Sequence, residues 1–214
     1  MEKPAFLFDL DGVIFDSEGQ YTVFWDQIGR EYLGMDGLAA RLKGETIETS
    51  LNRCFPEDRQ KKEEVRQKLY RFEAEMKFDY IPGAYDFLEY LKREGYPTAI
   101  VTSSNRLKMA KVYKARPEVP SLVDHILTGD DFSRSKPDPE CYLLGMKVCG
   151  SVPENTFIFE DSFNGLKSAR DARGKVIALA TTNSRDAVAP YADLVVDDFL
   201  DIRQAIATSF GIGL

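Results

Sequence analysis

This chain of 214 residues has few of the residues that build disulfide scaffolds or transition-metal sites. Its three cysteines, Cys54, Cys141 and Cys149, are odd in number and lack metal-ligand spacing. We find no signal peptide before them, so we expect reduced, mostly buried thiols in a cytoplasmic protein. The single histidine, His125, lies in an apolar stretch, where a strand residue is a better interpretation than a metal ligand.

The sequence also lacks an excess of basic residues and long apolar runs. Its formal net charge is -7, which argues against nucleic acid as a partner because phosphate backbones require clustered Lys and Arg. No apolar run approaches the roughly 20 residues of a membrane-spanning helix, and there is no internal repeat. We therefore expect a monomer with neither a membrane nor a nucleic-acid partner. A small phosphorylated substrate remains compatible with this charge.

The most informative feature present is a pair of aspartates directly after an apolar run. Ala5 to Phe8 are followed by Asp9-Leu10-Asp11-Gly12-Val13. The run is typical of a buried strand in a parallel sheet, and carboxylates are rarely buried without a partner. Residues i and i+2 of a strand share a face, and open parallel sheets bind ligands at this end of their strands. The pair therefore predicts a site for a hard cation such as Mg²⁺.

The second half of the chain alternates between expected strands and expected helices. A helix should follow Pro82-Gly83 and end at Gly95. The expected strands are Tyr96 to Val101, Ile126 to Leu127, Thr156 to Phe159, Val176 to Leu179 and Asp193 to Val196. This alternation predicts an α/β fold with a doubly wound parallel sheet.

Residues 17–79 interrupt this pattern with helical spacing and no convincing strand. We predict an all-helical cap at 17–79 and an α/β catalytic core at 1–16 and 80–214. The two linkers are expected near Phe15-Asp16 and Tyr80-Ile81-Pro82. A domain inserted in this way can act as a lid.

Two further strand ends carry polar residues with two interpretations each. Thr102-Ser103-Ser104 offers a hydroxyl and backbone N–H groups that suit a phosphate, but it is equally an ordinary helix start. Lys136, followed by Pro137, is either part of a surface turn or an ammonium that offsets phosphoryl charge.

The strand ending at Phe159 delivers a second acidic pair, Glu160 and Asp161. Asp161 or Ser162 could simply cap the next helix. However, four carboxylates at one sheet edge would repel one another and raise each other's pKa values, and a divalent cation removes that conflict. Together with the hydroxyl and the lysine, the two acidic pairs predict a phosphate-and-metal site.

In these motifs the chain resembles the haloacid dehalogenase-like (HAD) hydrolase superfamily. It is most similar to the branch that contains β-phosphoglucomutase and small-molecule phosphatases with a helical cap. Asp9 to Val13 match the first motif, Thr102 the second, and Lys136 to Pro139 the third. The fourth motif corresponds to Glu160-Asp161-Ser162 with Gly165.

The resemblance implies a role for each motif. Asp9 is the nucleophile that forms an aspartyl phosphate, and Asp11 is the general acid and base. Mg²⁺ is held by Asp9, the Asp11 backbone carbonyl, Asp161 and the further candidate Glu160, while phosphoryl oxygens are bound by Thr102, Lys136 and N–H groups near Leu10 and Ser103. Dehalogenases of the superfamily lack the second aspartate, so Asp11 argues against halide displacement.

The cap departs from the β-phosphoglucomutase pattern at two positions. Tyr21 stands where a histidine is expected and Ile47 where an arginine is expected, and isoleucine cannot grip a second phosphate. We therefore favour a phosphatase acting on a sugar phosphate-like metabolite or on pyrophosphate. A hexose-phosphate mutase and a non-catalytic binding module are the alternatives. The expected substrate-facing cap residues are Gln20, Tyr21, Lys43 and Glu45, whereas Trp25 is expected to pack within the cap.

Overall fold

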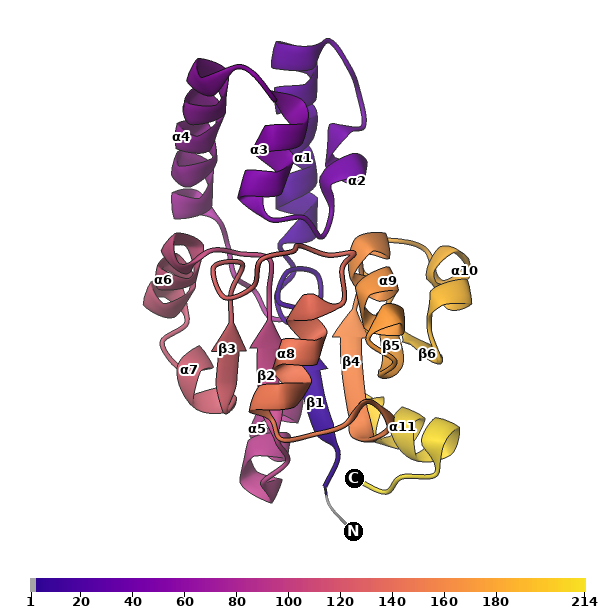
Figure 1. Cartoon of the computed structure of the whole chain (residues 1–214). Helices are drawn as coiled ribbons and strands as arrows, with labels where there is room; N and C mark the ends of the chain where they lie inside the picture. Colours follow the sequence, from indigo (N-terminus) through magenta and orange to yellow (C-terminus); the bar gives the residue numbers. More distant parts are fainter. Residues whose placement is uncertain (1–2) are drawn as a thin grey trace.

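A computed structural model describes residues 3–214, and its core is a parallel sheet of six strands in the order β3-β2-β1-β4-β5-β6 (Figure 1). The strands are β1 (Ala5–Phe8), β2 (Thr98–Val101), β3 (His125–Leu127), β4 (Thr156–Glu160), β5 (Lys175–Leu179) and β6 (Leu194–Val196). The predicted fold class is confirmed. Because β1 lies between β2 and β4, its end is at the centre of the sheet edge, where the strand order reverses.

The sheet is buried on both faces, which explains why its strands read as continuous apolar runs. Phe6 and Phe8 of β1 point to one hydrophobic cluster, and Leu7 points to the other. Phe8 stacks on Phe159 of β4 with ring centroids 4.6 Å apart. Such aromatic pairs hold β1 and β4 in the register that brings their acidic ends together.

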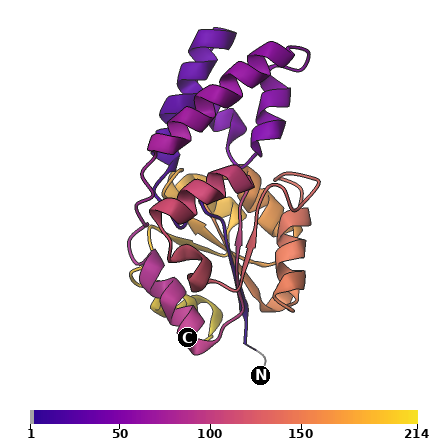
Figure 2. The same cartoon turned by 90° about the vertical axis from the view of Figure 1, so that its left-hand side faces the viewer.

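Helices cover both faces of this sheet (Figure 2). One cluster is formed with helices α5 (Ala84–Glu94), α6 (Arg106–Ala115), α7 (Val119–Leu122) and α11 (Ile202–Phe210), and the other with α8 (Glu140–Val148) and α9 (Phe163–Asp171). Shorter elements are η2 (Pro153–Asn155), α10 (Arg185–Val188) and η3 (Ala189–Tyr191).

A group of helices between β1 and β2 lies above the ends of the strands (Figure 1). It comprises α1 (Glu18–Ile28), η1 (Gly29–Leu33), α2 (Leu38–Leu42), α3 (Ile47–Cys54) and α4 (Arg59–Glu75). These helices share a hydrophobic cluster of their own, in which Trp25, Leu51 and Leu69 are buried. Trp25 thus packs within the cap, as expected.

Two chain segments that run side by side connect this helical group to the sheet. Phe15 pairs with Tyr80 in an antiparallel bridge, the backbone N–H of Asp16 donates to Asp79 at 2.9 Å, and that of Ile81 donates to Ile14 at 2.9 Å. These contacts tie the two segments together where the chain leaves the sheet for the helical group and where it returns.

Among residues 3–214, no helix is both long enough and apolar enough to cross a membrane. All three thiols are free, and of these only Cys141 is buried. His125 is the first residue of β3 and is exposed.

Candidate active site

The polar residues predicted at four strand ends meet beneath the helical cap. Asp9 follows β1, Thr102 follows β2, and Asp161 follows β4, while Lys136 comes from the loop between β3 and α8. The parallel arrangement places all these ends at one edge of the sheet. The topology alone thus assembles residues that are up to 152 positions apart in the sequence, from 9 to 161.

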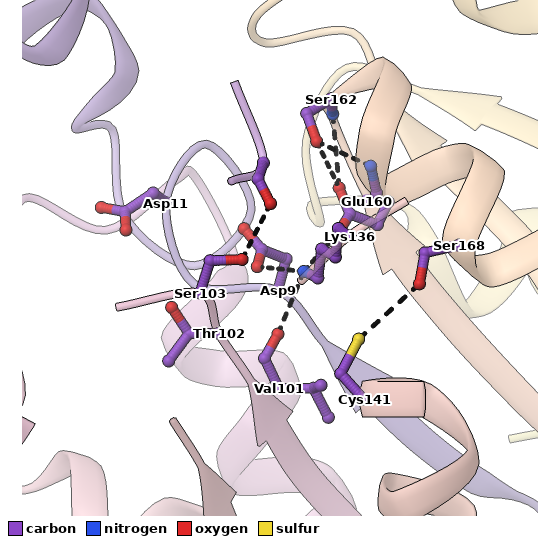
Figure 3. Close-up of polar contacts among 12 residues, drawn as sticks. Asp9, Asp11, Val101, Thr102, Ser103, Lys136, Cys141, Glu160, Ser162 and Ser168 are labelled. Carbon is purple, nitrogen blue, oxygen red and sulfur yellow. Dashed lines mark hydrogen bonds and ion pairs between the residues drawn. The ribbon is translucent and has the colours of Figure 1, made fainter. Parts of the chain in front are cut away.

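Lys136 links the two acidic pairs (Figure 3). Its Nζ lies 2.6 Å from Oδ1 of Asp9 and 2.6 Å from Oε1 of Glu160, and it also donates to the Val101 carbonyl at 3.2 Å. The side chain is only 1% exposed. Lys136 is therefore a buried, fully partnered ammonium and not part of a surface turn.

Burial and neighbouring charges shift the pKa values of the ionisable groups around Lys136. Burial raises the pKa of Asp9 to about 7, with Lys136 opposing the shift and Glu160 adding to it. Burial, followed by the charges of Glu18, Glu160 and Asp9, holds the pKa of Asp161 well above its ordinary value. Burial alone would lower the pKa of Lys136, but Asp9 and Glu160 raise it instead.

Glu160 accepts hydrogen bonds on both carboxylate oxygens. Oε1 accepts from Lys136 Nζ and from the Tyr142 hydroxyl at 2.6 Å, and Oε2 accepts from the Asp161 N–H at 3.0 Å and the Ser162 Oγ at 3.2 Å. With its donors already in place, Glu160 is suited to fixing Lys136 and the turn after β4.

The close approach of α9 to this carboxylate requires glycine at position 165. A Cβ built on Gly165 would lie 1.9 Å from Oε1 of Glu160. We expect Gly165→Ala to lower the free energy of unfolding by about 1–3 kcal/mol, since an overpacked site must shift its neighbours. Urea denaturation checks this.

Gly19 in α1 is the matched control, because a Cβ there would meet no atom within 4 Å. Gly19→Ala should instead stabilise the protein by about 0.5–1 kcal/mol, as alanine is the better helix former. Equal effects of the two substitutions would contradict this account of Gly165.

Asp161 shows where a cation fits. Within residues 3–214, its Oδ2 is buried and has no hydrogen-bond partner. Asp9, Glu160 and Asp161 each place a carboxylate oxygen within 4.8 Å of the others. A Cβ on Gly12, whose φ is +77°, would lie 2.2 Å from the free oxygen of Asp161, so glycine keeps this space clear. Clustered carboxylate oxygens of this kind suit Mg²⁺.

The carboxylate of Asp11 is separate from this group and lies on the other side of Asp9 from Lys136 (Figure 3). Its Oδ1 accepts from the Ser17 hydroxyl. Its Oδ2 accepts from Ser104 Oγ at 3.1 Å and from Lys108 Nζ. The two aspartates of the first motif thus have different surroundings, in keeping with the different roles predicted for them.

Thr102 and Ser103 lie at the turn between β2 and α6. Thr102 is 1% exposed, and its Oγ1 accepts from the Ser104 N–H at 3.0 Å. The Ser103 hydroxyl donates to the Gly44 carbonyl of the cap at 2.9 Å. The hydroxyl of Ser103 thus ties this turn to the cap, which leaves its backbone N–H as the group that can face a ligand.

A cavity that is open to solvent lies between the cap and these strand ends. Tyr21, Lys43 and Glu45 line it, as does Ile47. Lys43 pairs with Glu18 at 3.4 Å, and Glu45 with Arg53 at 2.6 Å.

Gln20 does not line this cavity. Its side-chain amide nitrogen donates to the Lys77 carbonyl at 3.0 Å, and its oxygen accepts from the Lys77 N–H at 3.0 Å. It joins α1 to the segment that follows α4 and is not brought together with Tyr21, Lys43 and Glu45.

Several residues at the site were not predicted from the sequence, and three of them carry charge or contact a charged group. Lys108 contacts Asp11, Tyr142 contacts Glu160, and Glu18 lines the cavity. Glu18 had a local signal, because it follows the first motif closely at the expected start of the cap. Lys108 and Tyr142 lie within helices whose polar patterns give no sign of an inward-pointing head group.

The parallel sheet, its acidic edge and the helical cap over it put the chain in the α/β class of enzymes that act at strand ends. Comparison with known proteins narrows this class: a family model described as haloacid dehalogenase-like hydrolase matches residues 3–173. The chain belongs to this family, and the resemblance drawn from its four motifs is confirmed.

Two relatives in other organisms are phosphatases by name. The chain is 31% identical to hexitol phosphatase A of Escherichia coli (strain K12) over 186 residues, which is 84% of each protein. It is 27% identical to a phosphorylated carbohydrates phosphatase of Thermotoga maritima over 183 residues, covering 78% of this chain and 81% of the relative. These relatives support the predicted enzyme class, a phosphatase.

Solved structures show the same fold. A hydrolase from Pseudomonas syringae superposes with a TM-score of 0.83 at 23% identity, covering 96% of this chain and 99% of the other. A β-phosphoglucomutase from Clostridium difficile superposes with a TM-score of 0.79 at 22% identity, covering 98% and 97%.

Proposed function

We propose that this protein is a Mg²⁺-dependent phosphatase that hydrolyses a small phosphorylated sugar or a similar metabolite through an aspartyl phosphate on Asp9. The observation that carries the proposal is the pairing of Asp9 with the buried Lys136 beside a partnerless Asp161 oxygen, directly below the cavity. Relatives named as carbohydrate and hexitol phosphatases support the substrate class. Pyrophosphate stays within the proposal as a substrate to be tested.

In this mechanism Asp9 attacks phosphorus, and the new O–P bond forms as the bond to the leaving oxygen breaks. Asp11 gives a proton to that oxygen. Asp11 then takes a proton from the water that attacks the aspartyl phosphate, which releases phosphate and restores Asp9. The turn at Thr102 and Ser103 would hold the phosphoryl oxygens, and the positive charge of Lys136 would offset their negative charge.

Asp9, Asp161 and the Asp11 backbone carbonyl would hold Mg²⁺, which supplies positive charge to the phosphoryl oxygens when bound. Glu160 would act on the cation through Lys136 and the turn after β4, because both its oxygens already accept hydrogen bonds. The cap at 17–79, closing over the core at 1–16 and 80–214, would exclude water during the transfer. A cytoplasmic monomer remains the predicted form.

A hexose-phosphate mutase is the second candidate, favoured by the fold shared with β-phosphoglucomutase. A mutase must hold a second phosphate on the cap side. Among the described residues that line the cavity, Lys43 and Lys108 are the cations and neither is an arginine. Each is already paired with a carboxylate, Glu18 or Asp11, so we favour hydrolysis.

Phosphate release from a panel of sugar phosphates, alditol phosphates, nucleotides and pyrophosphate tests the proposal. We expect turnover that EDTA abolishes and Mg²⁺ restores. Conversion of β-glucose 1-phosphate to glucose 6-phosphate without free phosphate would favour the mutase. No turnover on any compound, together with no rise in Tm from Mg²⁺ and beryllium fluoride, would favour a non-catalytic binding module.

Mg²⁺ should raise Tm more at pH 8 than at pH 5. The pKa of Asp9 is about 7 in the folded protein, compared with an ordinary value of 3.8. A raised folded-state pKa means that this carboxyl's contribution to stability falls as pH rises from about 4 to about 7. A cation offsets the charge that then appears. At 100 times its Kd it should add about 2.7 kcal/mol, or roughly 5–10 °C.

Differential scanning fluorimetry at both pH values checks this expectation. Asp161→Asn is the informative variant, because it removes the carboxylate whose oxygen lacks a partner. A Mg²⁺ shift that is equal at both pH values, or that survives in this variant, would contradict the assigned cation site.

A further inference from the structure

We propose that Lys108 is a positioning residue for Asp11, which it serves by holding the carboxylate in place and stabilising its negative charge during proton transfer. This inference rests on the proposed phosphatase function and extends it to a residue outside the four motifs. Lys108 lies in the first turn of α6, on the core side of the cavity.

Lys108 is buried and forms an ion pair with Asp11. Its side chain is 2% exposed, and lysine is almost never buried to this extent unless it is paired. Its Nζ donates to Oδ2 of Asp11 and lies 4.5 Å from the centre of the Tyr21 ring. The ammonium is thus enclosed between a core carboxylate and an aromatic ring of the cap.

Three donors fix the Asp11 carboxylate, and only one of them is charged. Ser17 occupies Oδ1, whereas Ser104 and Lys108 share Oδ2. Hydroxyl groups can orient a carboxyl group in either protonation state, because they both donate and accept. The ammonium only donates, so it selectively stabilises the carboxylate that Asp11 becomes after losing its proton.

This charge distinguishes substrates in the first step of the reaction, in which the leaving group departs. As the P–O bond breaks, the proton moves from Asp11 to the leaving oxygen, Asp11 becomes a carboxylate, and Lys108 keeps all its protons. An alkyl leaving oxygen needs this proton, whereas a nitrophenyl oxygen leaves readily without it. Loss of Lys108 should therefore slow poor leaving groups far more than good ones.

Lys111 provides a matched control on the same helix. Its Nζ lies 3.1 Å from Oε2 of Glu73 and donates to the Tyr70 carbonyl at 2.9 Å. It joins the core to the cap as Lys108 does, but it is not bonded to Asp11. Any general effect of losing a lysine between the core and the cap should appear in both variants.

The experiment compares Lys108→Met and Lys111→Met on two substrates. One is p-nitrophenyl phosphate, and the other is the alkyl phosphate that the wild type hydrolyses fastest. We expect Lys108→Met to lower kcat/KM, which reports the step that forms the aspartyl phosphate, about 100-fold on the alkyl ester and less than about 5-fold on the aryl ester. Lys111→Met should change both substrates by the same factor.

Two additional variants make the result decisive. Lys108→Gln retains a polar donor without the charge and should show the same selective loss, which guards against a folding defect in the methionine variant. In an Asp11→Asn background, Lys108→Met should add no further loss on either ester. Equal losses on both esters in the Lys108 variants, or an additive loss in the Asp11→Asn background, would overturn the inference alone. A wild type that hydrolyses neither ester would overturn the proposed function itself.

Discussion

Asp9→Asn should lower kcat for phosphate release by at least about 10⁴-fold, the range found when a residue that forms a covalent intermediate is removed. The amide has nearly the shape of the carboxylate but is not a nucleophile, so no aspartyl phosphate can form. Lys136 keeps its 2.6 Å contact with Glu160, and the fold should persist. Phosphate release with saturating Mg²⁺ measures the loss.

Asp16→Asn is the control for this variant. Asp16 belongs to the same segment after β1, but it is exposed in the linker, where its backbone N–H donates to Asp79. We expect its kcat to stay within about twofold of wild type, as for most surface substitutions. More than about 1% residual activity in Asp9→Asn would remove Asp9 from the role of nucleophile.

The strand ends were predictable because parallel topology converts sequence order into spatial proximity. Apolar runs identified β1, β2 and β4, and each run ended on a polar residue. In a parallel sheet all these ends lie at one edge. Asp9, Thr102 and Asp161 could therefore be assembled without knowledge of any side-chain contact.

The cap residues were harder to predict because they depend on the rotation of a helix about its axis. Gln20 and Tyr21 are neighbours in α1, and the side chains of neighbours on a helix point about 100° apart. Two such side chains rarely line the same cavity. The structure turns Tyr21 toward the cavity and Gln20 toward Lys77.

Lys108 illustrates a related limit. Its contact with Asp11 requires a particular direction of α6 relative to β1. In the sequence it is one of several lysines in a polar stretch, and nothing local distinguishes it from Lys111. Only the packing of α6 against the cap and core separates their roles.

Lys136→Met should destabilise the protein by about 3–5 kcal/mol in the absence of a divalent cation, as expected when one partner of a buried ion pair is removed. Lys136 lies 2.6 Å from both Asp9 and Glu160 and is 1% exposed. Its loss leaves two buried carboxylates without their shared cation, and a methionine of similar length cannot satisfy either. Urea denaturation in EDTA measures the change in the free energy of unfolding.

The decrease in the free energy of unfolding caused by Lys136→Met should be larger at pH 8 than at pH 5. Without Lys136 the pKa of Asp9, already raised to about 7 by burial, rises further, and protonation at low pH removes the unpaired charge. Lys167→Met is the control, because Lys167 is 58% exposed and forms a surface ion pair with Asp171 at 2.6 Å. This substitution should lower the free energy of unfolding by less than about 0.5 kcal/mol. Similar losses for the two lysines would mean that the buried pairing of Lys136 contributes no more than a surface ion pair.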